Sequence, residues 1–399
     1  MQISIFELPN NNSMKKTAII PLRKNSKGIP GKNKKKLVGR PLFSWVLAEA
    51  IFSDLDEVYV FTDDVEIIDF VNKNYTWAPK VKILLRDHAN ASDIATTESA
   101  MLEFSDKINN EYDALFLLQA TSPLTTSLDI NNGIAKIEKE KCDSAVAVVN
   151  THRFTWNKEG KPINYDVFNR PRRQDFEGLL IENGAIYGTT KEAFLSSKNR
   201  VSGNIALVEM PEESLCEIDT ASDWLIVEQL LMDRLKKQKE PEKITHLVLD
   251  VDGVFTDGTI FYDKNGESAK QFDMRDGMGL EILREHGVEV MVMTSEQSEI
   301  VAQRMKKLKI EHVYLGVKDK FALLRKILKD NNLSLNNMAY MGDDVNDLAN
   351  ICSVGWSFTP NNATQIVKLH ADIILSKNSG DGAIREACEF ILKYNKRKL

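Results

Sequence analysis

Several features that define common protein classes are absent from this 399-residue sequence. No apolar run reaches the roughly 18 residues needed to span a bilayer. The first thirteen residues lack the charged start and the long apolar core of a secretion signal. The four cysteines (Cys142, Cys216, Cys352 and Cys388) lie far apart without a CxxC pair, which predicts buried free thiols in a reducing compartment. We therefore expect a cytoplasmic protein that makes no membrane contact.

A strong excess of one charge is also missing. The sequence has 52 basic and 58 acidic residues, a formal net charge of −6 that is spread along the chain. This balance argues against a dedicated nucleic-acid binder. A hydrophobic fraction of 43% and a charged fraction of 28% are typical of a soluble globular protein with ample core.

The length predicts two domains of about 150–230 residues each. Residues 1–13 read as a flexible leader without an assigned function, because Met14 is itself a plausible start. A polar stretch containing Pro241 predicts a linker over 237–243. We therefore expect one domain over 14–236 and a second over 244–399.

Strand-like and helix-like segments alternate in both halves, which predicts α/β architecture with two Rossmann-like three-layer domains. In the first half, we expect strands over 18–22, 57–62, 80–85, 114–119 and 144–149, and helices over 43–51, 66–75, 96–109 and 128–139. A helix is expected over 223–238, followed by strands over 246–251, 289–293, 312–314, 338–341 and 353–356.

The loop over 23–33, RKNSKGIPGKN, follows the first expected strand. It combines the cations Arg23, Lys27 and Lys32 with two glycines, a composition suited to a phosphate site. Ligands of parallel sheets bind at the carboxyl ends of strands, where this loop lies. On its own, the stretch is equally compatible with a solvated basic loop.

Five further polar segments of the first half are candidates for the same site. On an extended segment, residues i and i+2 face one side, so Glu217 and Asp219 are placed to share one Mg²⁺ ion. Each segment also has an ordinary explanation, as a capping turn, a surface loop or a solvated acidic face. The segments are 86–97, 119–123 (QATSP), 170–175 (RPRRQD), 182–187 (ENGAIY) and 217–219 (EID). We expect ENGAIY to form a polar turn that leads into a strand.

Taken together and in order, these segments resemble the CMP-sialic acid synthetases, also called acylneuraminate cytidylyltransferases. The matching stretches are RKNSKGIPGKN, FTDD, QATSPL, PRRQD, ENGAIY and EIDTASDW, within residues 15–230. The SKGIPGKN form differs from the STRLPGKP-like form of the KDO cytidylyltransferases, which favours a sialic-acid-type sugar. The resemblance implies a nucleotidyltransferase fold that uses CTP and Mg²⁺ to convert a nine-carbon 2-keto acid into its CMP-sugar, with release of pyrophosphate.

The resemblance also implies residue roles. Arg23 and Lys32 would be catalytic, holding the triphosphate of CTP and its developing charge. The other implied ligands are Ser26, Lys27, Asn33 and Arg86 for the nucleotide, Gln119, Thr121, Ser122 and Tyr187 for the sugar pocket, Arg170 and Arg172 for the sugar carboxylate, and Glu217 and Asp219 for the metal. Two positions depart from the family pattern. Glu217 stands where an aspartate is usual, and Ile181 where bacterial single-domain members often have an arginine.

The second half begins with DVDGVFTDG, residues 250–258, after an apolar strand. Asp250 and Asp252 stand two residues apart at the end of this strand and are candidates for an acidic site. An acidic strand-to-turn junction explains the DxD pair equally simply. Later residues decide the interpretation, namely Thr294, Lys320 (with Lys318 less favoured), Asp343 and Asp347.

This set resembles the haloacid dehalogenase (HAD) phosphatases, and in particular the small KDO-8-phosphate phosphatases without a large cap. The subfamily motifs here read DGVFTDG, RDGMG (275–279) and GAIRE (382–386). The resemblance implies a nucleophile at Asp250, an acid at Asp252, phosphoryl contacts from Thr294 and Lys320, and an Mg²⁺ site formed by Asp250, Asp252, Asp343 and Asp347. Enzymes of this type commonly form tetramers.

Two departures, Thr294-Ser-Glu296 in place of TGR and Asp381 in place of an arginine, favour a sialic-type 9-phosphate over KDO-8-phosphate. We predict a bifunctional enzyme in a homo-oligomer (a tetramer or a dimer of dimers), with N-acetylneuraminate, KDN or a related nonulosonic acid as the sugar. In animal CMP-sialic acid synthetases, a similar domain has lost part of its aspartates and mainly supports assembly. A monofunctional cytidylyltransferase with an oligomerisation domain is therefore one alternative, and a non-catalytic nucleotide-binding regulator is another.

Overall fold

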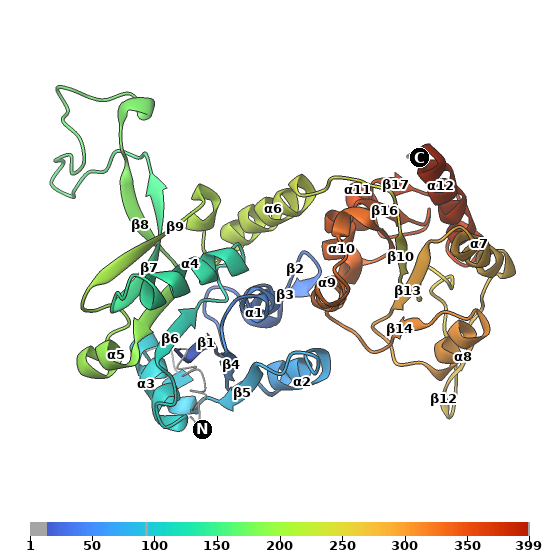
Figure 1. Cartoon of the computed structure of the whole chain (residues 1–399), viewed down its shortest axis with the longest axis horizontal. Helices are drawn as coiled ribbons and strands as arrows, with labels where there is room; N and C mark the ends of the chain where they lie inside the picture. Colours follow the sequence, from blue (N-terminus) through green and yellow to red (C-terminus); the bar gives the residue numbers. More distant parts are fainter. Residues whose placement is uncertain (1–13, 92–94, 398–399) are drawn as a thin grey trace, which may run out of the picture. The chain divides into compact units, whose positions relative to one another are not determined.

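The computed structural model describes residues 14–91 and 95–397 (Figure 1). The predicted leader over 1–13 lies outside the described residues. The chain divides into two compact units. Unit 1 holds the described residues up to Lys34 together with Leu42–Asp223, and unit 2 holds Lys35–Pro41 and Trp224–Leu399 as far as it is described. A short segment near the start of the chain therefore belongs to the second unit.

Unit 1 is built on a seven-stranded mixed sheet with the order β5-β4-β1-β6-β8-β7-β9. Its strands are β1 (Lys16–Leu22), β4 (Glu57–Thr62), β5 (Val81–Leu85), β6 (Ala114–Leu118), β7 (Ser144–Thr151), β8 (Leu179–Thr190) and β9 (Ile205–Met210). Strands β1, β4, β5 and β6 are parallel, whereas β8 runs antiparallel to both β6 and β7. The parallel part places the loops after β1, β5 and β6 at one edge of the sheet.

Helices cover both faces of this sheet, giving the expected three layers. Because side chains alternate along a strand, Leu115 and Leu117 pack with Phe104 in one cluster, while Phe116 faces the other side and lies beside Gly133. The helices are α1 (Leu42–Phe52), α2 (Val65–Asn74), α3 (Thr97–Lys107), α4 (Ser127–Glu138) and α5 (Lys191–Ser197), with 3-10 turns at Lys32–Lys34, His88–Ala91, Arg173–Asp175 and Glu212–Leu215. Helix α6 (Ala221–Lys237) begins in this unit and belongs to unit 2 from Trp224 onward.

Unit 2 contains a six-stranded parallel sheet with the order β14-β13-β10-β15-β16-β17. Leu247 and Leu249 pack with Leu280 on one face, and Val248 packs with Leu324 on the other, so this unit is also three-layered. The strands are β10 (His246–Leu249), β13 (Glu289–Met293), β14 (His312–Tyr314), β15 (Met338–Met341), β16 (Trp356–Thr359) and β17 (Ile373–Ile374). The helices are α7 (Met274–Glu285), α8 (Glu299–Lys307), α9 (Lys320–Asn331), α10 (Leu348–Ser353), α11 (Gln365–His370) and α12 (Ala383–Arg397), with 3-10 turns at Leu335–Asn337 and Val345–Asp347.

Two small hairpins complete unit 2. The first pairs β11 (Phe261–Asp263) with β12 (Gly266–Ala269). The second pairs β2 (Lys36–Leu37) with β3 (Arg40–Pro41), and it is the early segment of the chain that packs in this unit. The sequence patterns predicted neither hairpin, because strands this short show no usable alternation of apolar and polar residues.

Two local predictions were wrong. The strand expected over 353–356 lies at Trp356–Thr359, because Ser353 still belongs to α10, where its hydroxyl donates to the carbonyl of Ala349. The polar turn expected in ENGAIY is part of the continuous strand β8. A shift in the pairing register opposite 146–148, with Gly184 at φ +71°, accommodates the polar residues within the strand.

Surface and thiol properties agree with a globular chain. All four cysteines are free, and Cys142, Cys352 and Cys388 are buried, as predicted, whereas Cys216 is only half-buried. Within the described ranges, no helix has both the length and the apolar character needed to cross a membrane.

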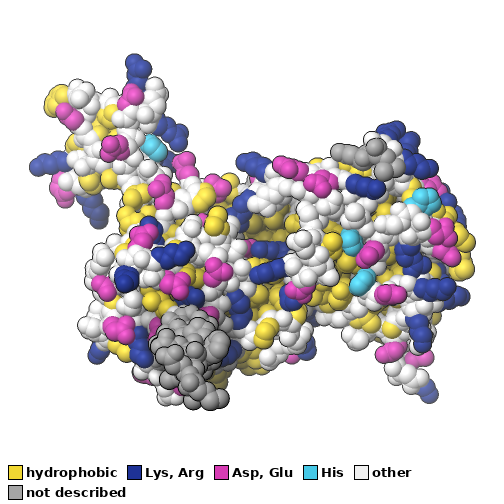
Figure 2. All heavy atoms as spheres, viewed as in Figure 1, with side chains coloured by type: hydrophobic (Ala, Val, Ile, Leu, Met, Phe, Trp, Pro, Cys, Tyr) yellow, Lys and Arg dark blue, Asp and Glu magenta, His cyan; other side chains and the backbone are white. Residues whose placement is uncertain are grey.

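Acidic and basic side chains are interspersed on the face of each unit that Figure 2 shows.

Candidate functional sites

The loop after β1 forms one wall of a cavity of about 320 Å³ in unit 1. Two other walls come from the chain after β5 and the chain after β6, as expected where the carboxyl ends of parallel strands meet. Most of the predicted CTP ligands line this cavity together with part of the predicted sugar pocket. Those lining residues are Arg23, Ser26, Lys32, Asn33, Arg86, Gln119 and Thr121.

The basic loop is held in place by its own side chains. The Asn33 amide donates to the carbonyl of Arg23 at 3.1 Å, closing the loop on itself. The Lys32 ammonium donates to the carbonyl of Ile218 at 2.7 Å and lies 3.1 Å from Oδ1 of Asp219. A methyl group added at Gly28 would meet the Asp219 carbonyl oxygen at 2.2 Å. Gly28 is therefore required by the close approach of two protein segments.

Arg86 is a buried cation at this cavity. Its side chain is only 8% exposed, and one guanidinium nitrogen donates to the carbonyl of Asn90 at 2.5 Å. Its buried Nε has no hydrogen-bond partner among the described residues. Burial, with a smaller contribution from the charge of Arg23, lowers the pKa of Arg86 from its ordinary value, although Glu103 and Asp63 oppose the shift. A bound anion would provide the missing partner and stabilise this charge.

The structure places the other predicted ligands of unit 1 outside the cavity lining. Ser122 is buried within the turn after β6, and Lys27 is exposed. Arg170 and Arg172 are exposed on the long segment between β7 and β8, which projects from the sheet in Figure 1. There, the Arg170 guanidinium stacks over Phe154 at 4.5 Å.

Tyr187 is a core residue of β8 and is 5% exposed. Its hydroxyl donates to Oε2 of Glu182 at 3.0 Å, and the Arg200 guanidinium lies 4.5 Å from the ring centre. Burial and the Glu182 carboxylate raise the pKa of Tyr187 to about 12. These contacts give Tyr187 a packing role, and its predicted contact with the sugar stays a prediction.

The Glu217–Asp219 segment lies beside the cavity because the backbone N–H of Ile218 donates to the carbonyl of Thr121 at 2.9 Å. The segment is not a regular strand. The side chain of Asp219 is 72% exposed, whereas Glu217 is partly buried against Gly184. Burial and the neighbouring Asp219 raise the pKa of Glu217, with Lys32 and Arg200 opposing. Two neighbouring carboxylates of this kind suit a divalent cation.

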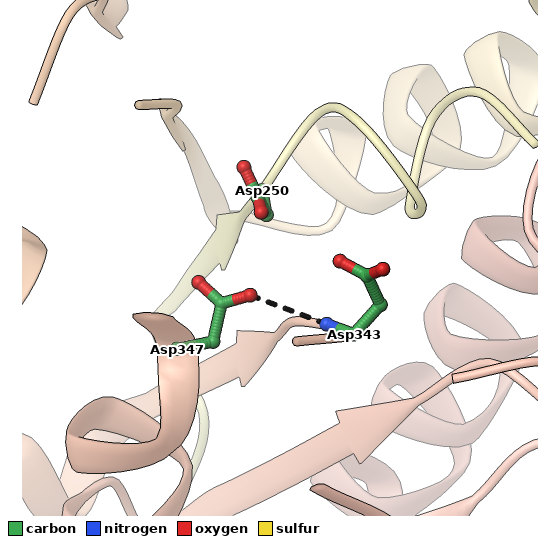
Figure 3. Close-up of side chains that lie close together, drawn as sticks. All are labelled: Asp250, Asp343 and Asp347. Carbon is green, nitrogen blue, oxygen red and sulfur yellow. Dashed lines mark hydrogen bonds between the residues drawn. The ribbon is translucent and has the colours of Figure 1, made fainter. Parts of the chain in front are cut away.

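Unit 2 contains a compact group of three carboxylates. Asp250 follows β10, and Asp343 and Asp347 follow the neighbouring strand β15. Ligand oxygens of the three lie within 4.8 Å of one another, and Figure 3 shows the side chains converging. A methyl group at Gly253 would meet Oδ2 of Asp343 at 2.0 Å, so only glycine fits against this group. Oxygen ligands at this spacing fit a hard divalent cation such as Mg²⁺.

A single buried lysine neutralises part of this charge. The side chain of Lys320 is completely buried, and its Nζ lies 2.8 Å from Asp250 and 2.7 Å from Asp347. Tyr340 adds a hydroxyl that donates to Asp347 at 2.6 Å. Burial and repulsion from Asp347 raise the pKa of Asp343 to about 7, and the same two causes raise the pKa of Asp250. Three carboxylates and one ammonium thus leave negative charge that a divalent cation would balance.

The other predicted residues of unit 2 lie nearby. Thr294 follows β13, which pairs with β10, and it is 2% exposed. The carboxylate of Asp252 stays outside the group of three, since its Oδ1 lies 2.6 Å from Nζ of Lys270 and its Oδ2 is buried without a hydrogen-bond partner among the described residues. Sequence reasoning missed Lys270, which also pairs with Glu267 at 3.0 Å. Its position five residues before the RDGMG motif was the only available signal.

Asp381, one of the departures from the subfamily pattern, forms an ion pair within unit 2. Asp381, which stands in place of an arginine, lies 2.5 Å from the Arg275 guanidinium. Arg275 in turn contacts Asp273 at the start of α7. The RDGMG motif and the tail segment are therefore joined by an ion pair of this chain's own.

Comparisons with known proteins match each half of the chain to a known family. A cytidylyltransferase family profile matches residues 17–203, and a haloacid dehalogenase-like hydrolase profile matches residues 292–386. The chain is 31% identical to N-acylneuraminate cytidylyltransferase B of Danio rerio over 409 residues, covering 99% of this chain and 94% of the relative. It is 33% identical to N-acylneuraminate cytidylyltransferase of Oncorhynchus mykiss over 397 residues, covering 95% and 89%. Its C-terminal part is 36% identical to a 3-deoxy-D-manno-octulosonate 8-phosphate phosphatase of Haemophilus influenzae over 156 residues, covering 39% of this chain and 87% of the relative.

The fold, the sites and these matches define a nucleotidyltransferase joined to a HAD-type hydrolase unit. Both resemblances inferred from the motifs are confirmed. Since the similarity extends along nearly the whole length, the chain belongs to the N-acylneuraminate cytidylyltransferase family.

Proposed function

We propose that unit 1 couples CTP to a nonulosonic acid, such as N-acetylneuraminate or KDN, and that unit 2 hydrolyses the 9-phosphate of the same sugar. The cavity lined by Arg23, Lys32 and Arg86 carries the first part of the proposal. Three cations at the ends of parallel strands match a triphosphate, and Gln119 and Thr121 supply neutral hydrogen-bonding groups beside them.

In the transfer reaction, the anomeric hydroxyl of the sugar attacks the α-phosphorus of CTP. The bond to the β-phosphate oxygen breaks, pyrophosphate leaves, and the hydroxyl proton passes to solvent or base. Positioning and charge neutralisation carry most of the catalysis in such phosphoryl transfers. Arg23 and Lys32 would hold the triphosphate, with Ser26, Asn33 and Arg86 completing its site. Glu217 and Asp219 would hold an Mg²⁺ ion that neutralises phosphate charge.

Recognition of the sugar carboxylate is assigned to Arg170 and Arg172. Their planar guanidinium groups match a carboxylate with two parallel hydrogen bonds. Because both lie on the projecting segment between β7 and β8 and outside the cavity lining, this role requires either movement of that segment or a second copy of the chain. The proposed homo-oligomer provides the second possibility.

In unit 2, Asp250 would attack the phosphorus of the sugar phosphate and form an aspartyl phosphate. Asp252 would give its proton to the departing sugar oxygen and then accept one from the water that hydrolyses the intermediate. Thr294 and Lys320 would contact the phosphoryl oxygens, and Lys270 would keep Asp252 oriented. Mg²⁺ held by Asp250, Asp343 and Asp347 would supply charge neutralisation at the phosphate.

The experiment measures two products from the purified full chain. With CTP, Mg²⁺ and N-acetylneuraminate or KDN, we expect release of pyrophosphate, and with the 9-phosphate of either sugar, release of inorganic phosphate. Asp250→Asn should abolish phosphate release and leave pyrophosphate release unchanged. Absence of pyrophosphate release with both sugars would refute the transferase proposal.

A different result would refute the phosphatase proposal alone. An intact 9-phosphate in the wild type, with normal transfer activity, would leave a monofunctional cytidylyltransferase. In that case, Asp250→Asn should leave both the transfer activity and the oligomeric state of the full chain unaltered.

A further inference from the structure

The hairpin formed by β2 and β3 places a strained turn inside unit 2. Its two central residues, Val38 and Gly39, have φ values of +46° and +80°, as a tight two-residue hairpin requires. A β-branched residue such as valine rarely adopts positive φ, because its side chain then clashes with the backbone. Val38 is nevertheless only 1% exposed, and Leu37 is fully buried. Packing in unit 2 therefore holds this turn in a conformation that its sequence disfavours.

Arg40, the residue after the turn, forms a buried ion pair. The side chain of Arg40 is 2% exposed and that of Asp319 is fully buried. The Arg40 guanidinium contacts both carboxylate oxygens, with Nε at 2.8 Å from Oδ1 and Nη2 at 2.9 Å from Oδ2. It also lies 5.0 Å from the ring centre of Phe321. This two-point geometry fixes the Asp319 carboxylate in both position and orientation.

Asp319 is the N-cap residue of α9. Its Oδ1 accepts from the N–H of Ala322 at 3.2 Å, which makes Asp319 the helix cap. The first residue of α9 is Lys320, whose ammonium contacts the nucleophile Asp250 and the carboxylate Asp347. The position of this ammonium therefore depends on how Asp319 is held.

A second contact of the hairpin reaches the loop that carries the other carboxylates. A methyl group added at Gly39 would meet the carbonyl oxygen of Val345 at 1.9 Å. Val345 begins the 3-10 turn Val345–Asp347, which follows Asp343. The hairpin is thus packed against both segments that flank Asp250.

We infer that the hairpin 36–41 is a positioning element of the phosphate site of unit 2, with Arg40 acting through Asp319 on Lys320. The inference rests on the phosphatase activity proposed above and adds to it a dependence on an early segment of the chain. That segment lies within the stretch that the cytidylyltransferase profile matches, although its contacts lie in unit 2. An isolated piece of residues 244–399 would contain every acidic residue of the phosphate site and lack the group that holds Asp319.

The test compares Arg40→Met with Arg40→Lys and with Lys239→Met in the full chain. Lys239→Met is the matched control, since it removes a cation paired with Asp372 elsewhere in unit 2. We expect Arg40→Met to lower kcat for release of phosphate about 10–100-fold, the loss that small misplacements of reacting groups cause. Pyrophosphate release should stay within about twofold of the wild type. The kcat of Arg40→Lys for phosphate release should lie between those of the wild type and Arg40→Met, because lysine keeps the charge without the two-point contact.

A second readout does not require turnover. Beryllium fluoride with Mg²⁺ mimics a phosphoryl group on a carboxylate, so it should raise the Tm of the wild type and of Lys239→Met. We expect a smaller rise for Arg40→Met. If Arg40→Met does not fold, Arg40→Lys is judged by the same two measurements.

Wild-type phosphate release and an unchanged beryllium fluoride shift in the folded Arg40 variants would overturn the inference. A wild type that gains stability from beryllium fluoride and hydrolyses no sugar phosphate would refute the proposed activity, while the shift still tests the hairpin. A wild type that shows neither response refutes both.

Discussion

The ammonium of Lys320 lies 2.8 Å from Oδ2 of Asp250, and neither side chain has appreciable contact with solvent. Burial alone would favour the neutral form of each group, yet the two charges stabilise one another at this distance. Their attraction raises the pKa of Lys320 against the opposing effect of burial, which is the largest single cause. The lysine therefore stays protonated and is one of the groups that allow three carboxylates to lie together.

Replacing Lys320 with Met should destabilise unit 2 by about 3–5 kcal/mol, because it leaves buried carboxylates without their partner. The measurement is urea unfolding of the full chain, with the transition of unit 2 identified by its response to Mg²⁺. Added Mg²⁺ should recover part of the loss, since it supplies positive charge to the same oxygens. Lys318→Met is the control, because this exposed lysine should change stability by less than about 0.5 kcal/mol. Equal losses in the two variants would contradict the prediction.

Arg86→Met should raise the KM for CTP about 10–100-fold, because a buried charge-assisted contact to an anion contributes about 1.5–3 kcal/mol. The exposed Lys24 of the basic loop provides the control, since it carries the same charge and is not part of the cavity lining. Initial rates of pyrophosphate release at varied CTP give both constants. A KM that rises equally in Lys24→Met would mean that general basic charge, and not Arg86 itself, attracts the nucleotide.

Two glycines of the basic loop should respond differently to alanine. At Gly28, the added methyl group would meet the Asp219 carbonyl oxygen at 2.2 Å, so the loop must move away from the Glu217–Asp219 segment. We expect a loss of transfer activity of about 100-fold with phosphate release unchanged. At Gly31, φ is +64° and the space is open, so alanine should cost about 1 kcal/mol of stability and little activity. Similar activity of the two variants would show that the contact with Asp219 is dispensable.

Much of the architecture was predictable from periodicity. The strands β13, β14 and β15 begin and end at the predicted residues. Short apolar runs bounded by polar turns leave little choice of where a strand begins and ends. Strand β8 was not predicted in full, since its exposed residues Leu179–Glu182 and its register shift break any regular pattern. The motifs also placed Asp250 and Asp343 at the ends of strands, where the structure has them.

Contacts between segments that are distant along the chain could not be predicted from the sequence. Nothing in the local pattern around Arg40 indicates Asp319, which lies 279 residues away. The partnership of Lys270 with Asp252 was equally hidden, because a lysine three residues after a glutamate normally indicates a solvated surface. Motifs identify the groups that perform chemistry, whereas the residues that orient these groups are selected by three-dimensional proximity alone.

Asp276 of the RDGMG motif should make unit 2 sensitive to pH. This carboxyl is 1% exposed, and its Oδ1 accepts from the N–H of Arg385 at 2.9 Å, while its Oδ2 is without a hydrogen-bond partner among the described residues. Burial, with repulsion from Asp273, raises the pKa of Asp276 from 3.8 to about 6. Between these two pKa values, the folded state holds a proton that the unfolded state has released.

The free energy of unfolding should therefore fall as pH rises from about 4 to 6, by at most about 1.4 kcal/mol per pH unit from this group. Asp276→Asn keeps the size and the acceptor oxygen without the charge. The variant should be more stable than the wild type at pH 7, and the difference should shrink as pH is lowered toward 4. Contributions of the other carboxyl groups cancel in this comparison, so urea unfolding of both proteins across the range isolates Asp276. A difference that stays constant from pH 4 to 7 would show that the carboxyl is ionised in the folded state throughout.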